Sequence, residues 1–331
     1  MSDCKKNAES LAAQTKNDLK FETKIRGLNM EEDITIEKLI NSFRTTGLQA
    51  TNIYLAIEEI DRMKKSKIFF GCTSNMISCG VREIICHLAK YKLIDVFVTT
   101  GGGIEEDLMK TMFDHKLASF DLKGKDLREN GCNRIGNLVI QNESYFRFEK
   151  WFNLFLDDLL VGYTQENPLI ITPSIFIKKM GEKINNEESI LYWAAKNNIS
   201  VYSPALIDGS IGDMLTFYNN RAALKLDIVE DSYRMNKEAM FEKNTGAIVL
   251  GGGLIKHHVL NANLFKDGLN HCVLINTAND FDGSDAGANI EEAISWGKVS
   301  ADNKAVKVSG DASVIFPLVA LGSFLKGKTR E

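Results

Sequence analysis

Residues 67–78, KIFFGCTSNMIS, begin as a short apolar run and end in a cluster of small polar residues. An apolar run that stops at Thr, Ser and Asn is typical of a buried β-strand whose carboxyl end opens onto a turn. Five further stretches repeat this pattern: DVFVTT (95–100), SVYSPA (200–205), AIVLGGG (247–253), CVLINTA (272–278) and AVKVSG (305–310).

Helical patterns alternate with these strands, for example at 82–93, 188–198 and 312–325. Strands that are apolar throughout and alternate with helices form parallel sheets that are covered on both faces. The sequence therefore predicts an α/β fold, with a doubly wound, mostly parallel sheet and helices on both of its faces.

The remaining segments indicate how the chain is organised. Apolar residues recur every three or four positions across 34–66, which predicts a helix ahead of the first strand. Residues 1–22 are polar and are expected to form a mobile N-terminal arm, and 23–331 to form a single α/β domain. Within that domain, 110–190 breaks the alternation and is expected to be an excursion packed on the same core.

Composition excludes several classes of protein. The formal net charge of -4 argues against nucleic acid as a partner. No apolar stretch approaches the roughly 18 residues of a membrane span, and no apolar leader begins the chain, so neither membrane insertion nor secretion is expected. The six cysteines form no CxxC pair, which favours reduced thiols in a cytoplasmic protein.

Polar residues gather where the predicted strands end. Ligands of open α/β sheets bind outside the carboxyl ends of the strands, and helix N-termini there favour anionic groups. The glycine triplets at 101–103 and 251–253 would let backbone N–H groups approach a phosphate, although tight strand-to-helix turns would also explain them. Two triplets at equivalent strand ends favour a dinucleotide bound without the usual fingerprint.

Carboxylates also fall at or just beyond these strand ends. They are Glu105, Glu106, Asp208, Asp213, Asp282, Asp285, Glu291 and Glu292. Any one of them could belong to a solvated rim, and we expect two of the three acids at 105–107 to complement a helix dipole from the first turn. Gathered in one crevice, they would bind a polycation. Their spacing matches no metal-binding pattern, so no metal site is predicted.

Two further features could carry chemistry. His257 and His258 are adjacent, so their side chains diverge; one could act as a general base, or either could be a hydrogen-bonded structural histidine. Within EEAISWGKVS (291–300), Trp296 and Gly297 could hold Lys298 against an apolar wall. A desolvated lysine amine forms imines with carbonyl or iminium carbons. Those ten residues alone favour a solvated surface lysine.

Long motifs, taken together, change this interpretation. They include TSNMIS (73–78), TTGGGIEEDLMK (99–110), LRENGCNRIGN (127–137), SPALIDGSIGDM (203–214), LGGGLIKHH (250–258) and NTANDFDGSDAGANIEEAISWGK (276–298). In this order they resemble the deoxyhypusine synthase family, and the resemblance runs from about 44 to 318.

This resemblance implies a Rossmann-like fold of the kind that sirtuins share, and a homotetramer with active sites between subunits. It also implies the reaction. NAD dehydrogenates spermidine, the aminobutyl group is held as an imine on a lysine with loss of 1,3-diaminopropane, and the group passes to one lysine of the hypusine-containing translation factor.

The resemblance also assigns roles to residues. Lys298 would be the nucleophile and His257 the base. Substrate-binding positions would be Glu105, Glu106, Asp213, Asn261, Gly283, Ser284, Asp285, Glu292 and Trp296. Cofactor-binding positions would be Ser74, Asn75, Met76, Ile77, Ser78, Thr100, Gly101, Gly102, Glu106, Asp208, Gly252, Thr277, Ala278, Asp311 and Ala312.

Three alternatives stay open at this point. Homospermidine synthase, which shares the chemistry, would deliver the aminobutyl group to putrescine. A non-catalytic regulatory paralogue would be expected to lack the nucleophile or its neighbours, and here all of them are present. NAD consumption of the sirtuin type is an alternative that rests on the fold alone.

Overall fold

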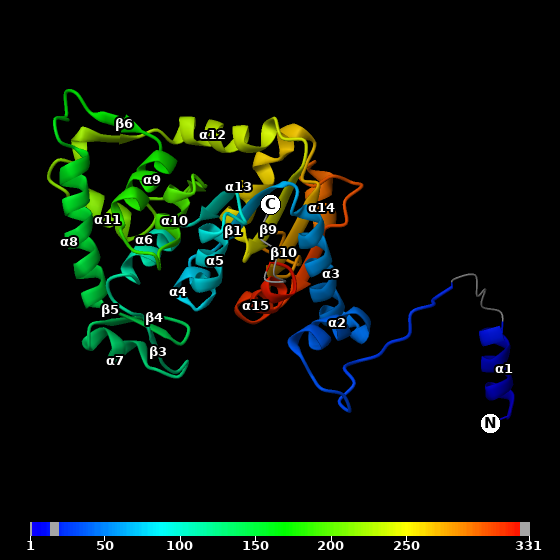
Figure 1. Ribbon diagram of the computed structural model, residues 1–331. Coiled ribbons are helices and arrows are strands. Elements are labelled where there is room, and N and C mark those ends of the chain that lie inside the picture. Colours follow the sequence, from blue (N-terminus) through cyan, green and yellow to red (C-terminus); the bar gives the residue numbers. More distant parts are fainter. Residues whose placement is uncertain (1, 14–19, 325–331) are drawn as a thin grey trace.

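The structure, a computed structural model, describes residues 2–13 and 20–324 (Figure 1). Of the predicted arm, residues 1 and 14–19 lie outside the described residues. The chain begins with α1 (Ser2–Ala13), followed by α2 (Ile36–Thr46) and α3 (Leu48–Met63). The single helix predicted across 34–66 is therefore wrong. Gly47 separates two helices because its backbone has φ +91° and ψ 177°, a conformation that an α-helix cannot contain.

Six parallel strands form the central sheet, and they are the six strands predicted from the sequence. The strands are β1 (Lys67–Cys72), β2 (Val96–Thr99), β7 (Ser200–Tyr202), β9 (Thr245–Leu250), β10 (His271–Asn276) and β11 (Val306–Ser309). Their order in the sheet is β11-β10-β9-β1-β2-β7, and every neighbouring pair is parallel. The expected doubly wound α/β fold is confirmed.

Helices cover both faces of this sheet. On one face α3, α5 (Val81–Lys90) and α15 (Ala312–Gly322) pack over β1 side chains such as Ile68 and Phe70. On the other face α12 (Ile228–Met240), α13 (Gly253–Ala262) and α14 (Ile290–Ser295) pack over Phe69. Successive residues of β1 thus enter opposite cores, which explains why its strand pattern is apolar throughout.

The chain changes direction at β1. From β1 it runs outward through β2 and β7, returns to β9 on the other side of β1, and continues outward through β10 and β11. Such a reversal opens a crevice between the carboxyl ends of the two strands that flank it. Gly71 of β1 allows α13 to lie close at this point, since a Cβ there would be 3.0 Å from Ile255 Cγ2.

Two long segments leave the central sheet, one between β2 and β7 and the other between β7 and β9. The first is the longer. It begins with α6 (Gly101–Met109) and includes the antiparallel sheet of β3 (Lys116–Leu117), β5 (Leu138–Gln141) and β4 (Cys132–Ile135), with α7 (Gly124–Glu129) beside it. Next come α8 (Asn142–Leu159), β6 (Leu169–Ile171), α9 (Pro173–Lys183) and α10 (Ile190–Lys196). After β7 follow α11 (Ser210–Phe217), a 3-10 turn at Arg221–Ala223, and β8 (Leu224–Leu226), which pairs with β6.

The side chains of α8 and α9 belong to the same core as the central sheet. Phe148, Phe152, Phe155 and Phe176 are buried there, and their rings contact one another in tilted and edge-to-face arrangements. Among the described residues no helix is both long and apolar enough to cross a bilayer.

The break at Gly47 can be tested by substitution. Gly47→Ala should lower the stability of the protein by about 1–3 kcal/mol, because an L side chain is strained in this region of φ and ψ. Urea or thermal unfolding measures the effect. Gly124→Ala is the control: its Cβ also meets nothing within 4 Å, but its backbone has no positive φ. Equal stability of the two variants would contradict the strained-turn account.

Candidate active site

One pocket of the structure has a volume of about 370 Å³. Its walls come from α13, the 277–289 loop and α14. The lining residues are Lys256, His257, Leu260, Asn261, Leu264, Gly283, Asp285, Ala288, Glu292, Ala293, Trp296 and Lys298. Seven of the residues singled out in the sequence therefore share one cavity. A larger pocket of about 520 Å³ between α9, α10 and α12 holds none of them.

Lys298 lies beside Trp296 in this pocket. The Lys298 Nζ is 5.7 Å from the centroid of the Trp296 ring, within range of a cation–π contact. The turn between them depends on Gly297, whose φ is +69°, and the Lys298 amide donates to the Ala293 carbonyl at 3.0 Å. The side chain of Trp296 is 65% exposed, so its ring is available to an aliphatic ligand.

Two carboxylates line the same pocket as this lysine and come from different elements. Asp285 belongs to the 277–289 loop, and its Oδ2 is buried without a hydrogen-bond partner. Glu292 is exposed on α14, whose N-cap Asn289 accepts the Glu292 amide at 2.9 Å. A buried carboxylate oxygen without a donor is costly, and an ammonium group would satisfy it.

The two adjacent histidines have different surroundings. His257 is exposed and lines the pocket, one helical turn from Asn261 on α13. His258 points away from the pocket, and burial lowers its pKa to about 4. His258 is therefore a neutral structural side chain at pH 7, whereas the imidazole of His257 is exposed in the pocket.

A second acidic group lies on the other side of β1, on α6 and α11. Glu106 accepts a hydrogen bond from the Ser78 hydroxyl, and burial, together with the neighbouring charge of Glu105, raises its pKa to about 7. Glu105 accepts the Ile211 amide at 2.9 Å, and burial also raises its pKa. Asp213 is exposed on α11, and its charge acts on Glu105 in the same direction. These three acids do not line the Lys298 pocket.

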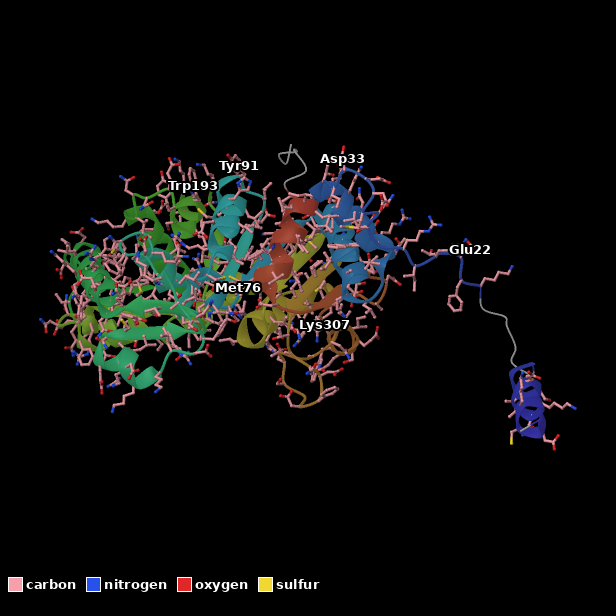
Figure 2. All side chains as sticks on the ribbon, turned by 90° about the horizontal axis from the view of Figure 1, so that it is seen from below. Glu22, Asp33, Met76, Tyr91, Trp193 and Lys307 are labelled. Carbon is pink, nitrogen blue, oxygen red and sulfur yellow. The ribbon has the colours of Figure 1, made fainter. Side chains whose placement is uncertain are left out.

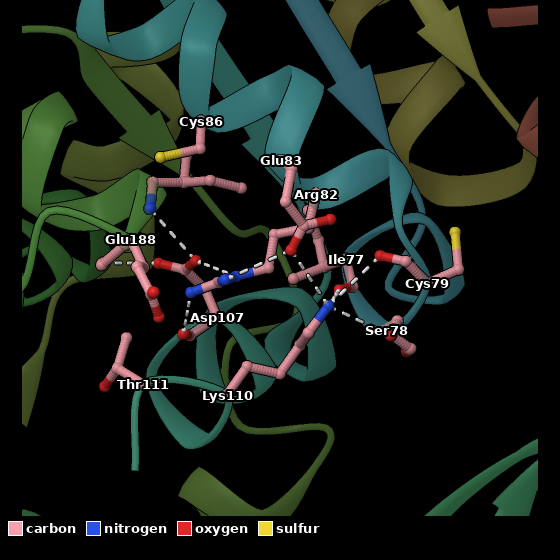
Figure 3. Close-up of polar contacts among 12 residues, drawn as sticks. Ile77, Ser78, Cys79, Arg82, Glu83, Cys86, Asp107, Lys110, Thr111 and Glu188 are labelled. Atoms are coloured by element: carbon pink, nitrogen blue, oxygen red, sulfur yellow. Dashed lines mark hydrogen bonds and ion pairs between the residues drawn. The ribbon is translucent and has the colours of Figure 1, made fainter. Parts of the chain in front are cut away.

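The expectation that two of the three acids at 105–107 complement the helix dipole from the first turn is wrong. α6 begins at Gly101, so residues 105–107 follow the first turn, and all three side chains are buried. Asp107 is structural: its Oδ1 pairs with the Arg82 Nε at 2.8 Å (Figure 3). Its Oδ2 accepts the Ser189 hydroxyl at 2.7 Å. It joins α6 to α5 and α10 beneath the site.

Lys110 is a residue that the sequence did not single out. Its Nζ donates to the carbonyl oxygens of Ile77, Ser78 and Cys79 at 3.1, 3.3 and 3.2 Å (Figure 3). These are the last carbonyls of the short helix α4 (Asn75–Ser78), which follows β1. Lys110 thus fixes the 73–78 turn against α6. Nothing in the sequence pattern marks a lysine for this role, because its partners are backbone atoms about 30 positions away.

The predicted cofactor positions lie along the carboxyl edge of the sheet. Gly102 lies against Ser74, where a Cβ would be 3.1 Å from the Ser74 Cβ, and Gly252 lies against Ala286. Thr100 Oγ1 is buried without a partner. α6 and α13 both begin without a side-chain cap, which leaves their N-terminal N–H groups open to an anionic ligand.

Other predicted cofactor residues have structural roles. The side chains of Met76, which is labelled near the middle of the molecule in Figure 2, and of Ile77 are buried in the core. Asp311 caps α15 by accepting the Ser313 amide at 2.8 Å, and Ala312 is buried behind it. Asp208, Thr277 and Ala278 follow β7 and β10, and of these Asp208 and Thr277 are exposed.

Comparisons with known proteins agree with one another. A profile described as deoxyhypusine synthase matches residues 38–323. The chain is 54% identical to the deoxyhypusine synthase of Encephalitozoon cuniculi, covering 97% of this chain and 96% of that one. It is 44% identical to homospermidine synthase 2 of Senecio vernalis, covering 93% and 90%. A crystal structure of a candidate deoxyhypusine synthase from Entamoeba histolytica superposes with a TM-score of 0.69 at 30% identity, covering 93% and 100%.

The buried carboxyl of Glu106 gives a pH-dependent prediction. Its folded pKa, about 7, is above the ordinary value of 4.5, so the folded chain binds this proton more tightly than the unfolded chain. Stability therefore falls as the pH rises between these values, by up to about 3 kcal/mol. Glu106→Gln should be more stable than the unsubstituted protein at pH 8, and the gain should shrink towards pH 4.5.

Thermal melting of the ligand-free protein across this pH range measures the effect. The matched control is Glu292→Gln, because Glu292 is an exposed carboxylate of the neighbouring pocket. A gain that is the same at pH 5 and pH 8 would show that burial of the Glu106 charge is not its cause.

Proposed function

The chain belongs to the deoxyhypusine synthase family and is a transferase with that activity; from this premise we propose that Lys298 carries the aminobutyl group of spermidine to the acceptor. The observation that carries the proposal is the pocket in which Lys298 and Trp296 meet His257, Asp285 and Glu292. The acceptor is one lysine of the hypusine-containing translation factor.

Recognition of spermidine rests on charge and shape. A polyamine presents ammonium groups separated by short apolar chains, so each buried ammonium needs a carboxylate and each chain needs an apolar wall. Asp285 Oδ2, buried without a donor, suits one ammonium, and Glu292 suits another. The exposed ring of Trp296 suits the methylene chain between them.

Two side chains of the pocket carry the chemistry. His257 accepts the proton that the secondary amine of spermidine loses as its neighbouring carbon is oxidised. The Lys298 amine then forms a bond to that carbon, the carbon–nitrogen bond to 1,3-diaminopropane breaks, and the aminobutyl group stays on Lys298 as an imine. The acceptor lysine displaces Lys298 in the same way, which regenerates the free amine.

The cofactor is NAD, and the residues along the sheet edge fit it. The uncapped N-termini of α6 and α13 suit its phosphates, the close backbone at Gly102 and Gly252 suits its pyrophosphate bridge, and Thr100 Oγ1 lacks a donor or acceptor. When bound, NAD supplies the oxidation of the polyamine and the final reduction of the imine. Glu106 connects the cofactor positions to the other two acids. It accepts a hydrogen bond from Ser78, and it is next to Glu105, on which the charge of Asp213 acts.

The active site is shared between two subunits of a homotetramer. Glu105, Glu106 and Asp213 lie on one side of β1 and the Lys298 pocket on the other, so one chain does not bring the two groups into one cavity. Large apolar side chains beside both groups are exposed, among them Phe217 at 80% and Phe281 at 91%. Such exposure supports a covering partner, and a second copy would complete the acidic site.

The protein acceptor is favoured over putrescine. The identity of 54% to a deoxyhypusine synthase over nearly the whole of both chains exceeds the 44% to a homospermidine synthase. We also propose a cytoplasmic location, which the six free cysteine thiols of the described residues suit.

Lys298→Ala tests the covalent step. The variant should keep its fold and bind NAD, but it should lose all transfer, because alanine has no amine to form the imine. The purified protein is incubated with NAD and spermidine, treated with borohydride and analysed by peptide mass. A butylamine adduct on the peptide that contains Lys298 is expected, and none in the variant. Transfer by Lys298→Ala would rule out the imine on this residue.

Mixing two inactive variants tests the shared site. Lys298→Ala and Asp213→Ala remove residues from opposite sides of β1, so a mixed pair of subunits contains one site free of both substitutions. Random pairing should restore about one quarter of the activity. Lys298→Ala mixed with Glu292→Ala is the control, because both residues line one pocket and no intact site can form. Equal recovery, or none, in both mixtures would contradict a site shared in this way.

A further inference from the structure

The 277–289 loop connects β10 to α14 and carries residues of both proposed ligand sites. Thr277 and Ala278, at its start, belong to the proposed cofactor edge, while Gly283 and Asp285 line the Lys298 pocket. No helix or strand spans the loop. Its backbone carbonyls therefore need partners from elsewhere.

Lys256 supplies two of these partners. It lies on α13, one position before His257, and its side chain is 1% exposed. Its Nζ donates to the Asp285 carbonyl at 2.5 Å and to the Ala288 carbonyl at 2.7 Å. Burial lowers the pKa of Lys256, whereas the Asp285 carboxylate opposes that shift. A buried ammonium that donates to carbonyls holds them at fixed positions, because losing either bond leaves a charge underpaired.

Lys307 supplies two more partners from β11. Its Nζ donates to the Gly287 carbonyl at 2.7 Å and to the Ala278 carbonyl at 3.3 Å, and it lies beside the loop in Figure 2. The carbonyls held by the two lysines alternate along the chain: Ala278 and Gly287 by Lys307, Asp285 and Ala288 by Lys256. Lys307 thus ties the start of the loop to its end, and Lys256 holds two further carbonyls near the end.

The backbone of the loop is folded tightly on itself. A Cβ on Gly287 would lie 1.4 Å from the Asn279 carbonyl oxygen, and a Cβ on Gly252 would lie 2.7 Å from the Ala286 Cα. The loop therefore packs against its own start and against the turn that follows β9. Such close contacts leave little room for the carbonyls to shift unless the whole loop moves.

We propose that Lys256 and Lys307 are positioning residues that hold the 277–289 loop in the conformation that binds both the polyamine and the cofactor. This inference rests on the function proposed above for the two ends of the loop. Lys256 acts mainly on the polyamine end through Asp285, whose carboxylate faces the pocket. Lys307 acts mainly on the cofactor end through Ala278.

Lys256→Met and Lys307→Met test the assignment, with Lys266→Met as the matched control. Lys266 also donates to a backbone carbonyl, that of Gly268, at 2.8 Å, and its other hydrogen bond goes to Asn270 and not to the loop. For each purified full-length variant we would measure hydrogen exchange of 277–289, the Kd for NAD and the KM for spermidine. Lys307→Arg keeps N–H donors at this position and should therefore show slower exchange of 277–289 than Lys307→Met.

Faster exchange confined to 277–289 is expected in both loop variants and not in Lys266→Met. Lys256→Met should raise the KM for spermidine at least about tenfold, and Lys307→Met the Kd for NAD by a similar factor. Unchanged exchange of the loop in Lys307→Met, or the same ligand effects in Lys266→Met, would overturn the proposal. If Lys256→Met does not fold, Lys307→Met decides alone.

The exchange experiment needs no ligand, so it separates this inference from the proposed function. A parent protein that forms no Lys298 adduct would refute the proposed function, while the exchange of 277–289 would still show whether the two lysines hold the loop.

Discussion

Charges buried beneath the carboxyl edge of the sheet need partners, and the arrangement of the site depends on how they are paired. Asp107 is paired with Arg82, and the ammonium groups of Lys110 and Lys256 are satisfied by backbone carbonyls. Each pairing fixes a segment that has no regular structure of its own. In a medium of low polarity these bonds cannot be exchanged for water, so the segments that they hold are rigid.

Against that fixed frame, a few polar atoms stay without partners. Asp285 Oδ2 in the Lys298 pocket and Thr100 Oγ1 at the start of α6 are both buried and unsatisfied. Folding leaves such atoms unpaired only at a cost, which a ligand can offset. Asp285 Oδ2 lies in the proposed polyamine site and Thr100 Oγ1 in the proposed cofactor site. Both atoms are buried, so the surrounding protein fixes their positions before a ligand binds.

Much of the fold could be predicted because it follows from local patterns. The six strands of the central sheet are the six apolar runs, since a strand buried on both faces must be apolar along its whole length. The break at Gly47 was missed because helical periodicity continues across it, and only the backbone angle separates α2 from α3. The burial of residues 105–107 was missed because the sequence did not reveal that α6 begins at the glycine triplet.

The sequence by itself determined the order of the motifs along the chain and the residue types at the end of each strand, because motifs and periodicity are local properties. The tertiary structure alone decided which of those residues share a cavity. Lys298, His257, Asp285 and Glu292 meet in one pocket, whereas Glu106 and Asp213 lie across β1 from it. The physical reason is that the sheet runs outward from β1 in both directions, so distance in space is set by strand pairing, which no single stretch of sequence contains.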